Sequence, residues 1–361
     1  MEVVFVLNCG SSSIKFQLIE PESGDVYLKG LAENLNTSRA TLKWSNGSKD
    51  LGRGDYDDAL GEILHLLGDE KILGIGHRVV HGGEFFSASV KIDKDVLSKI
   101  KECNHLAPLH NPAAALGIEI MGKTFPDLPQ IAVFDTSFHQ SMPQVAYLYA
   151  LPYEYYETFQ IRRYGFHGTS HRYVVQKGAD EIGKPLSETS FISCHLGNGC
   201  SIAAVRGGES LDTSMGLTPL EGLVMGQRCG DLDPSIVGFL AEKLQVSGED
   251  VTSILNKKSG LLGISGISED MRLLTESADP RAKLAIDIFC YRLAKYIAAY
   301  LVPLQHIDGV IFTGGIGENA SGIRDQVMTH LNPFNLKALV IPTNEELMIA
   351  RDAAAIVRKA L

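Results

Sequence analysis

The sequence predicts an α/β protein built from two related domains, and three observations lead to this fold class. The chain has 361 residues, more than one hydrophobic core usually serves. An apolar run from Val3 to Leu7 predicts a buried strand, and a Gly/Ser turn joins it to a second strand at 14–19. The same order of strand, Asn/Gly/Ser turn and strand returns at 190–205. We therefore expect two α/β domains that face each other, each directing its turn at a shared cleft.

The expected first domain comprises residues 1–149, with a C-terminal helix at 345–361 packing back on it. Periodicity predicts further strands at 26–32, 40–44, 72–80 and 131–134, and helices at 55–67 and 111–123. Asn111 is expected as the N-cap of the second helix, with Pro112 at its first position. Strand 131–134 would end at Asp135, where a buried carboxylate needs a partner.

The expected second domain comprises residues 150–344 and alternates helices with strands. Helices are predicted at 169–182, after Asp233-Pro234, around 270–272 and at 280–301, and strands at 190–196, 202–205 and 310–313. A glycine-rich turn is expected at 314–319, and Thr343-Asn344 would cap the last helix. Helix 280–301 would fill a core or a dimer seam with its apolar positions, which are Leu284, Ile288, Tyr291, Leu293, Ala294, Ile297 and Leu301.

Composition and charge exclude several classes. An apolar content of 45% is typical of a globular protein, and a net charge of −10 disfavours general nucleic-acid binding. No apolar run approaches the roughly 18 residues of a membrane span, and no basic leader with a cleavage site begins the chain, so we expect a cytoplasmic protein without a membrane partner. The six cysteines lack zinc spacing and are expected to be reduced. Cys9, Cys200 and Cys229 lie in glycine-rich stretches, either as alkylation-sensitive residues or, more commonly, as small buried ones.

The first turn is rich in donors for phosphate. A strand follows it, whereas the Walker and dinucleotide glycine loops both open a helix, so neither motif applies. The turn offers backbone N–H groups, serine hydroxyls, the Asn8 amide and the Lys15 ammonium, which suit phosphate oxygens and a hydrated divalent cation. An ordinary serine-rich surface hairpin is the alternative.

Nine motifs run through nearly the whole chain: NCGSSSIK at 8–15, GHRVVHGG at 76–83, LAPLHNP at 106–112, FDTSFH at 134–139, YGFHGTSH at 164–171, HLGNG at 195–199, RCGDLDP at 228–234, GIGEN at 315–319 and TNEE at 343–346. In this order they resemble the acetate kinase family, within the actin-like and sugar-kinase-like phosphotransferases. The resemblance implies two duplicated actin-like (ribonuclease H-like) domains with a catalytic cleft between them, and a homodimer formed through the second domain.

The implied reaction is reversible transfer of a phosphoryl group from ATP to acetate, giving ADP and acetyl phosphate, with Mg²⁺ or Mn²⁺. A carboxylate is a nucleophile at neutral pH and needs no base, but its approach to a polyanion requires cations and oriented donors. Propionate or butyrate is the alternative substrate. A sugar or glycerol kinase, or a non-catalytic actin-like ATP-binding protein, fits less well, because neither needs an arginine pair beside an apolar pocket.

The resemblance also assigns catalytic roles. Arg78 and Arg228 would bind at the acyl end, because a planar guanidinium can grip a carboxylate or a phosphoryl group with two bonds. His167 would donate to the transferring phosphoryl group, with His110 and His195 along the same path. Asp135 would orient an arginine or the magnesium shell, although a salt bridge or helix cap is an alternative role. Asn8 and Glu345 would be metal ligands, and Glu345 would also favour the helix start.

The remaining implied contacts concern the nucleotide and the acyl group. Nucleotide contacts would come from Ser11, Ser13, Lys15, His195, Leu196, Gly197, Asn198, Gly199, Asp270, Met271, Arg272, Gly315, Ile316, Gly317, Glu318 and Asn319. The acyl group would lie against Val80, Leu109, Phe166 and Pro219. Three features depart from the family pattern: Cys200 replaces a glycine or other small residue, Gln227 replaces a common threonine, and the stretch 323–343 is short, which we interpret as a trimmed surface excursion and not a lost strand.

Overall fold

The computed structural model describes residues 2–68, 70–108 and 110–359. The chain forms two compact units, one of residues 1–138 and 344–361 and the other of residues 139–343. None of the helices in the described ranges has both the length and the apolar character needed to cross a membrane.

Unit 1 contains an eight-stranded mixed sheet with the order β5-β4-β3-β2-β1-β6-β8-β7. Its strands are β1 (Glu2–Gly10), β2 (Ser13–Ile19), β3 (Val26–Glu33), β4 (Ala40–Trp44), β5 (Gly47–Gly52), β6 (Lys71–Val79), β7 (Val90–Lys91) and β8 (Gln130–Phe134). β1 pairs antiparallel with β2 and parallel with β6, and β6 pairs parallel with β8. The predicted strand-turn-strand start of the chain is therefore confirmed.

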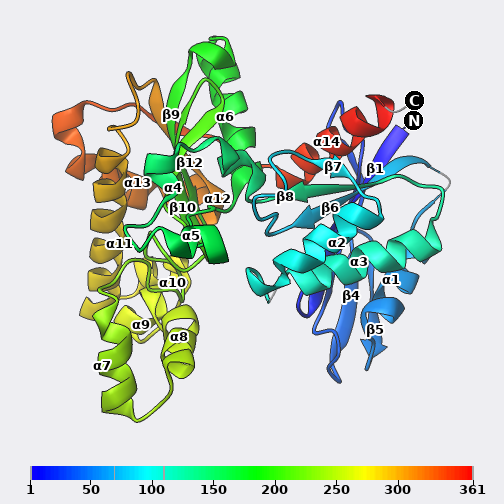
Figure 1. Cartoon of the computed structure of the whole chain (residues 1–361), viewed down its shortest axis with the longest axis horizontal. Helices are drawn as coiled ribbons and strands as arrows, with labels where there is room; N and C mark the ends of the chain where they lie inside the picture. Colours follow the sequence, from blue (N-terminus) through cyan, green and yellow to red (C-terminus); the bar gives the residue numbers. More distant parts are fainter. Residues whose placement is uncertain (1, 69, 109, 360–361) are drawn as a thin grey trace. The chain divides into compact units, whose positions relative to one another are not determined.

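Helices cover both faces of this sheet. They are α1 (Tyr56–His65), α2 (Lys94–Glu102), α3 (Asn111–Thr124) and α14 (Glu345–Lys359). Figure 1 shows α14 on one face and α1 to α3 on the other. Close packing needs glycine at Gly76, where a Cβ would lie 2.6 Å from Ile349 Cγ2 of α14, and at Gly117 of α3, where a Cβ would lie 2.7 Å from Cys9 Sγ. The central strands β1 and β6, whose middle residues are buried, thus lie between two helical layers.

Unit 2 contains a five-stranded sheet with the order β11-β10-β9-β12-β13. Its strands are β9 (Ser190–Leu196), β10 (Cys200–Arg206), β11 (Glu209–Thr213), β12 (Gly309–Thr313) and β13 (Ala338–Val340). Its α-helices are α4 (Gln144–Tyr147), α5 (Glu154–Phe159), α6 (Gly168–Ile182), α7 (Ser235–Leu244), α8 (Gly248–Lys257), α9 (Gly260–Ser265), α10 (Met271–Glu276), α11 (Pro280–Ala299), α12 (Gly314–Asn319) and α13 (Ser321–His330).

Both units share one arrangement of five strands. In each, an antiparallel meander of three strands is followed by two parallel strands: β3-β2-β1 with β6 and β8 in unit 1, and β11-β10-β9 with β12 and β13 in unit 2. The strand-turn-strand units recognised in the sequence are the inner pairs of these meanders. The parallel strands of each unit end at one edge of the sheet, where βα connections leave side chains and N–H groups for ligands.

Two local predictions were wrong. Asn111 is the first residue of α3 and not its N-cap, because its side chain bonds the backbone of His81 on both the N–H and C=O sides. Residues 314–319 form helix α12 and not a turn, with the Glu318 carboxylate accepting the N–H of Gly314 at 2.9 Å. Of the apolar positions predicted for α11, Leu293, Ala294 and Ile297 are buried in the core, whereas Leu284 and Tyr291 are 51% and 54% exposed, and the dimer seam stays a prediction.

Candidate active site

The clearest polar constellation in unit 1 is an arginine held by a buried carboxylate. Arg78 near the end of β6 donates from Nε to Asp135 Oδ1 at 3.0 Å and from Nη2 to Asp135 Oδ2 at 2.7 Å. β6 and β8 run parallel, so the two side chains reach the same edge of the sheet. Burial alone would lower the pKa of Arg78, but Asp135 and Glu345 raise it above its ordinary value. The guanidinium is therefore charged and fixed in direction.

Carboxylates gather beside this arginine at the start of α14. Glu345 Oε2 lies 4.0 Å from Arg78 Nε, and Glu346 pairs with Lys15 of β2. Burial, together with the charges of Asp135 and Glu346, raises the pKa of Glu345 to about 7 against the opposing effect of Arg78 and Lys15. Asn344 caps the helix as predicted, its side chain accepting the N–H of Leu347 at 3.0 Å. Negative charge in this corner exceeds what Arg78 and Lys15 neutralise.

Most of the other predicted residues of unit 1 lie in strands β1, β2 and β6 or directly after them. Asn8 is paired with Lys15 across β1 and β2, and Ser11 and Ser13 lie in and just after the exposed turn between these strands. Val80 is half-buried directly after β6, and His110 is exposed at the start of α3. Leu109 lies outside the described residues.

In unit 2, His167 and Arg228 converge on the turn between β9 and β10. A Cβ built on Gly199 would lie 3.1 Å from Arg228 Nη2, 3.3 Å from His167 Cε1 and 3.4 Å from His167 Nε2. His167 has the left-handed conformation, with φ of 54°, just before α6. A non-glycine residue in this region carries strain, which structures retain where a side chain must be aimed.

Arg228 is a partly buried cation with few partners. Its Nη1 donates to the carbonyl of Pro219 at 2.8 Å, and within the described part of the chain this is its single acceptor. Burial lowers the pKa of Arg228 below its ordinary value. A guanidinium carries five N–H donors, and leaving them unbonded away from water is costly. The arrangement therefore favours an anion beside Arg228 and His167.

An ionic network fixes the loop that carries Pro219 and Arg228. Arg163 donates to the carbonyls of Thr213 and Ser214, each at 2.9 Å, and to Glu221 at 2.6 Å. Asp231 accepts the N–H of Gly222 at 2.9 Å. Sequence reasoning missed this network, because its members are separated by up to 68 residues and no local motif joins them. It gives the arginine a rigid support.

Two of the three departures from the family pattern, Cys200 and Gln227, have local roles. Cys200 is fully buried and donates from Sγ to the carbonyl of Gly197 at 3.2 Å, which stabilises the 197–199 turn. Burial raises the pKa of this thiol to about 12, so it is a poor nucleophile. The amide of Gln227 donates to Glu269. Neither residue obstructs the cluster around Arg228.

Replacing Gly199 by alanine is expected to lower kcat about tenfold, because a new methyl group would displace Arg228 and His167 by a few tenths of an ångström. Stability should change little, since the backbone of Gly199 is outside the left-handed region. Steady-state kinetics and a thermal melt check both points. Gly322→Ala on α13, where a Cβ would meet nothing within 4 Å, is the matched control and should keep wild-type kcat. Equal kcat for the two variants would contradict the placement of the cluster.

A cavity of about 860 Å³ adjoins this turn within unit 2. Its walls come from the 197–199 turn, α10 and α12, and its lining residues are Gly197, Asn198, Glu269, Asp270, Met271, Arg272, Thr275, Glu276, Gly315, Ile316, Asn319 and Ala320. The volume and the mixture of apolar and polar walls are typical of a small-molecule site. Eight of the residues predicted to contact a nucleotide thus line one cavity.

The other predicted nucleotide residues of unit 2 lie elsewhere. Leu196 is fully buried in β9, and Gly317 packs against the backbone of Phe312. The Glu318 carboxylate accepts the N–H groups of Gly314 and Thr343, so it fixes the entry into α12. The ring of His195 stacks on that of His167, with centroids 4.3 Å apart. Phe166 is buried, and its carbonyl lies 3.0 Å from His139 Nε2.

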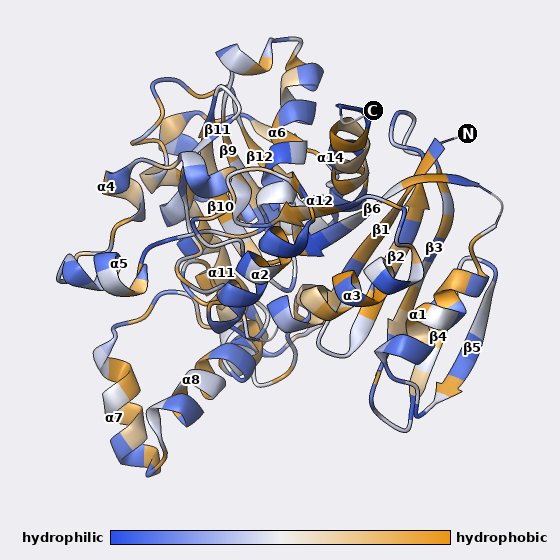
Figure 2. Cartoon of the chain, turned by 45° about the vertical axis from the view of Figure 1, so that its right-hand side comes forward, coloured by the Kyte–Doolittle hydropathy of each residue, from blue (hydrophilic) through white to orange (hydrophobic). Residues whose placement is uncertain are grey.

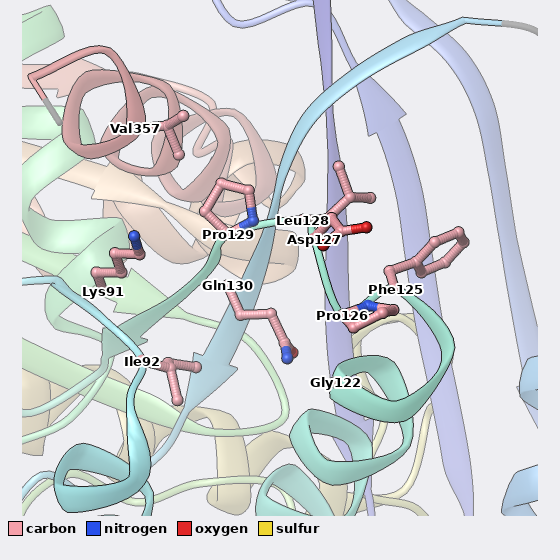
Figure 3. Close-up of a pocket in the computed structure, with 10 residues that line it drawn as sticks. All are labelled: Lys91, Ile92, Gly122, Phe125, Pro126, Asp127, Leu128, Pro129, Gln130 and Val357. Atoms are coloured by element: carbon pink, nitrogen blue, oxygen red, sulfur yellow. The ribbon is translucent and has the colours of Figure 1, made fainter. Parts of the chain in front are cut away.

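A second cavity, of about 380 Å³, lies in unit 1 at the opposite end of β8 from Asp135. Figure 3 shows Lys91 and Ile92 on one side of it and Phe125 on the other. None of the predicted site residues lines it. Gln130, which lines this cavity, has its side-chain amide 2.6 Å from Nε2 of His77, the neighbour of Arg78. In the orientation that satisfies all hydrogen bonds of this amide, the Gln130 nitrogen donates to His77 Nε2. His77 is then a neutral acceptor.

Acidification is expected to destabilise unit 1 through His77. Burial lowers the pKa of His77 from 6.5 to about 4, so the unfolded chain takes up a proton before the folded one does. The contribution of neutral His77 to the free energy of unfolding is complete above pH 6.5. It is lost as the pH falls toward 4, and the total loss is about 3 kcal/mol. Thermal melts between pH 7.5 and 4.5 measure this loss. His77→Gln, which cannot titrate, should show a shallower decline; parallel curves would exclude His77 as the cause.

The two α/β units have the same strand arrangement. Unit 1 holds Arg78 against Asp135, and unit 2 contains a cavity large enough for a nucleotide. These features define the class of two-domain actin-like phosphotransferases. The model of the Acetokinase family matches residues 3–338. The acetate kinase of Shewanella sp. (strain ANA-3) is 49% identical over 402 positions, which cover 99% of each chain. The chain belongs to the acetokinase family.

Solved structures agree with this assignment. The crystal structure of a propionate kinase from Francisella tularensis subsp. tularensis SCHU S4 matches with a TM-score of 0.94 at 46% identity, covering 98% of this chain and 99% of that one. The crystal structure of Porphyromonas gingivalis acetate kinase matches with a TM-score of 0.93 at 40% identity, covering 99% and 100%. The family and the actin-like fold class predicted from the sequence are thereby confirmed, and the chain is a phosphotransferase. Despite the short 323–343 stretch, the strand β13 is present.

Proposed function

We propose that this enzyme transfers the γ-phosphoryl group of ATP to acetate, reversibly, with the acetate carboxylate attacking phosphorus directly. The observation that carries the proposal is the under-bonded guanidinium of Arg228 beside His167, at the turn that also forms a wall of the nucleotide-sized cavity. An anion is the expected occupant of such a place, and a transferring phosphoryl group or an acyl carboxylate is the anion that the family's reaction supplies.

The charged side chains of the two units would have different roles. Asp135 occupies Nε and Nη2 of Arg78, which leaves the Nη1 edge to bind the acyl carboxylate or acyl phosphate. Arg228 and His167 would stabilise the charge on the equatorial oxygens during transfer. A general base is unnecessary because acetate is ionised at neutral pH.

ATP would bind in the cavity of unit 2. Asp270, Met271 and Arg272 at the start of α10 and Gly315 and Ile316 of α12 line its walls. Glycine at 315 leaves open space where a side chain would stand, since a Cβ there would meet nothing within 4 Å. Adenosine would therefore pack between α10 and α12, with its phosphates toward the 197–199 turn. His195, Gly199 and the first-turn residues Ser11, Ser13 and Lys15 stay predicted phosphate contacts.

The residues of unit 1 fit a Mg²⁺ ion, for which Mn²⁺ is the alternative. Asn8 and Glu345 would hold it. Burial and, after it, the charges of Asp135 and Glu346 raise the pKa of Glu345, and a bound cation would favour its ionised form. Clusters of three or more His, Cys, Asp or Glu suited to a metal are absent from the described ranges. Mg²⁺ commonly takes few protein ligands and completes its shell with water and nucleotide phosphates. When bound, the ion would neutralise phosphate charge.

A homodimer formed through unit 2 is part of the proposal. None of the ten residues of α7 is buried, although it carries Ile236, Phe239 and Leu244, and Phe239 is 60% exposed. Figure 2 shows hydrophobic residues along this helix. Leu284 and Tyr291 of α11 are also more than half exposed. Contiguous patches of exposed apolar side chains are typical of protein contact surfaces. The cytoplasmic location stays a prediction.

Propionate is the second candidate substrate, favoured by the match to a propionate kinase structure. Of the residues expected to line the acyl pocket, Phe166 is buried and Val80 is half-buried. One methylene in an apolar pocket changes discrimination by about 1–3 kcal/mol, so the choice between the two acids depends on small shifts.

Hydroxylamine trapping tests the proposal. The purified protein with MgATP and hydroxylamine is assayed in parallel with acetate, propionate, butyrate and glycerol. We expect hydroxamate with acetate or propionate, with a kcat/KM ranking that identifies the acid, and a rate lower by about 10³ with Arg78→Ala. ADP release with glycerol and no hydroxamate with any acid would overturn the carboxylate kinase and favour a polyol kinase.

A further inference from the structure

A chain of hydrogen bonds joins His167 to the buried interior of unit 2. His167 Nδ1 lies 2.9 Å from Ser201 Oγ, and the same hydroxyl lies 2.8 Å from His171 Nε2. On its other side, His171 Nδ1 lies 2.8 Å from Ser193 Oγ. Ser193 is on β9, Ser201 on β10 and the two histidines at the start of α6. Figure 1 shows α6 alongside β9.

The direction of this chain follows from its buried end. Ser193, His171 and Ser201 are all fully buried. Among the residues that the structure describes, His171 Nδ1 is the single hydrogen-bond partner of the Ser193 hydroxyl. A buried hydroxyl proton without an acceptor is costly, so Ser193 donates and His171 Nδ1 accepts. His171 must then carry its proton on Nε2.

The remaining protons are placed by the same rule. His171 Nε2–H donates to Ser201 Oγ, and the Ser201 hydroxyl has one other neighbour in the described chain, His167 Nδ1. Ser201 therefore donates to His167 Nδ1, which has to be unprotonated to accept. A doubly protonated His171 would leave the Ser193 proton without an acceptor, and burial independently lowers the pKa of His171 well below its ordinary value.

We infer that the chain Ser193, His171 and Ser201 fixes the tautomer of His167, so that its proton stands on Nε2 and is presented to the transferring phosphoryl group. This inference rests on the proposed function for the role of His167, but not for the proton's position. Nε2 is the ring nitrogen nearest to the position of a Gly199 Cβ, on the Arg228 side of the turn. The opposite tautomer would direct a lone pair at phosphate oxygens, which is repulsive.

His171, Ser201 and Ser193 are thus positioning residues. They act through His167, as the third member of a catalytic triad acts through its histidine. No two of the four residues are neighbours along the chain, and the serines lie 22 and 30 residues from His171. The selection of a single tautomer before substrate binds would reduce the rearrangement needed during transfer.

Nitrogen-15 NMR of the histidine rings tests the inference directly. In the full-length enzyme without substrates at pH 7.5, we expect His167 to show a protonated Nε2 and an unprotonated Nδ1, with His171 in the same tautomer. The His167 signals are assigned with His167→Gln. His167 found with its proton on Nδ1, or doubly protonated, would overturn the inference whether or not the protein phosphorylates acetate.

Variants then separate positioning from simple structural support. Ser201→Ala should mix the His167 tautomers and lower kcat about 10- to 100-fold, with the KM for ATP changed less than threefold. Ser193→Ala should also mix the His167 tautomers and lower kcat, although Ser193 is remote from the substrate. Ser193→Thr keeps the hydroxyl and should restore the single tautomer and the wild-type kcat. Ser210→Ala, which removes the buried serine at 2.8 Å from His139 Nδ1, is the matched control and should leave the His167 tautomer unchanged. An unchanged tautomer in both Ser201→Ala and Ser193→Ala would contradict the inference.

Discussion

Arg78→Ala is expected to lower kcat/KM by about 10³ and also to destabilise unit 1. The loss of activity follows from the proposed role, since an oriented cation at the reacting anion contributes about this factor. The loss of stability, about 3–5 kcal/mol, follows because Asp135 would remain as a buried carboxylate, 2% exposed, without its two bonds from Arg78. Hydroxamate kinetics and thermal melts measure the two effects.

A double variant separates the two consequences of removing Arg78. In Arg78→Ala/Asp135→Ala the buried charge is gone, so the melting temperature should recover most of its loss while kcat/KM stays low. Arg78→Lys keeps a charge but not the planar fork and should lose about 10². Recovery of activity in the double variant would show that Arg78 serves only to neutralise Asp135, and would contradict its role in binding the acyl group.

Arg228→Ala is expected to lower kcat by about 10³ with the opposite effect on stability. Arg228 has one acceptor in the described part of the chain, the carbonyl of Pro219, and burial lowers its pKa. Its removal deletes an under-bonded, partly buried cation, so the melting temperature should be unchanged or higher. Sites that bind charged transition states commonly carry such uncompensated charge.

Anion binding provides the second readout for Arg228. Inorganic phosphate at millimolar concentration should raise the melting temperature of the wild-type enzyme by mass action and should have a smaller effect on Arg228→Ala. Arg163→Met is the comparison variant, because it removes the bonds to Thr213, Ser214 and Glu221 that fix the loop. It should destabilise the enzyme. A melting temperature for Arg228→Ala as low as that of Arg163→Met would show that Arg228 is a structural residue.

The strands with apolar, β-branched runs were predictable, because burial on both faces leaves a continuous hydrophobic signal, as in β1, β6 and β9. β5 (Gly47–Gly52) was missed, because nearly all of its residues are exposed and its position depends on pairing with β4. In α12, three glycines suggested a turn, whereas the Glu318 carboxylate bonding the N–H of Gly314 favours a helix. Tertiary contacts decided both cases.

The candidate site was likewise predictable from the sequence only in part. The sequence predicted which arginines, histidines and glycine-rich turns to consider, and the structure collects eight of the predicted nucleotide residues around one cavity. The bond between Arg78 and Asp135 joins residues 57 positions apart, and the contacts of His171 with Ser193 and Ser201 join two strands and a helix. Such pairings depend on strand register, which no local spacing in the sequence reveals.

Oxygen-isotope transfer tests the central claim most directly, that the carboxylate itself attacks phosphorus. The enzyme is incubated with MgATP and acetate labelled with ¹⁸O at both carboxyl oxygens, and acetyl phosphate is analysed by mass spectrometry before it hydrolyses. We predict that both labelled oxygens are retained, one of them in the bridge to phosphorus, because only the bond between phosphorus and the ADP oxygen breaks. Loss of one label would show that a carboxyl oxygen leaves during the reaction, and direct transfer to the carboxylate would be contradicted.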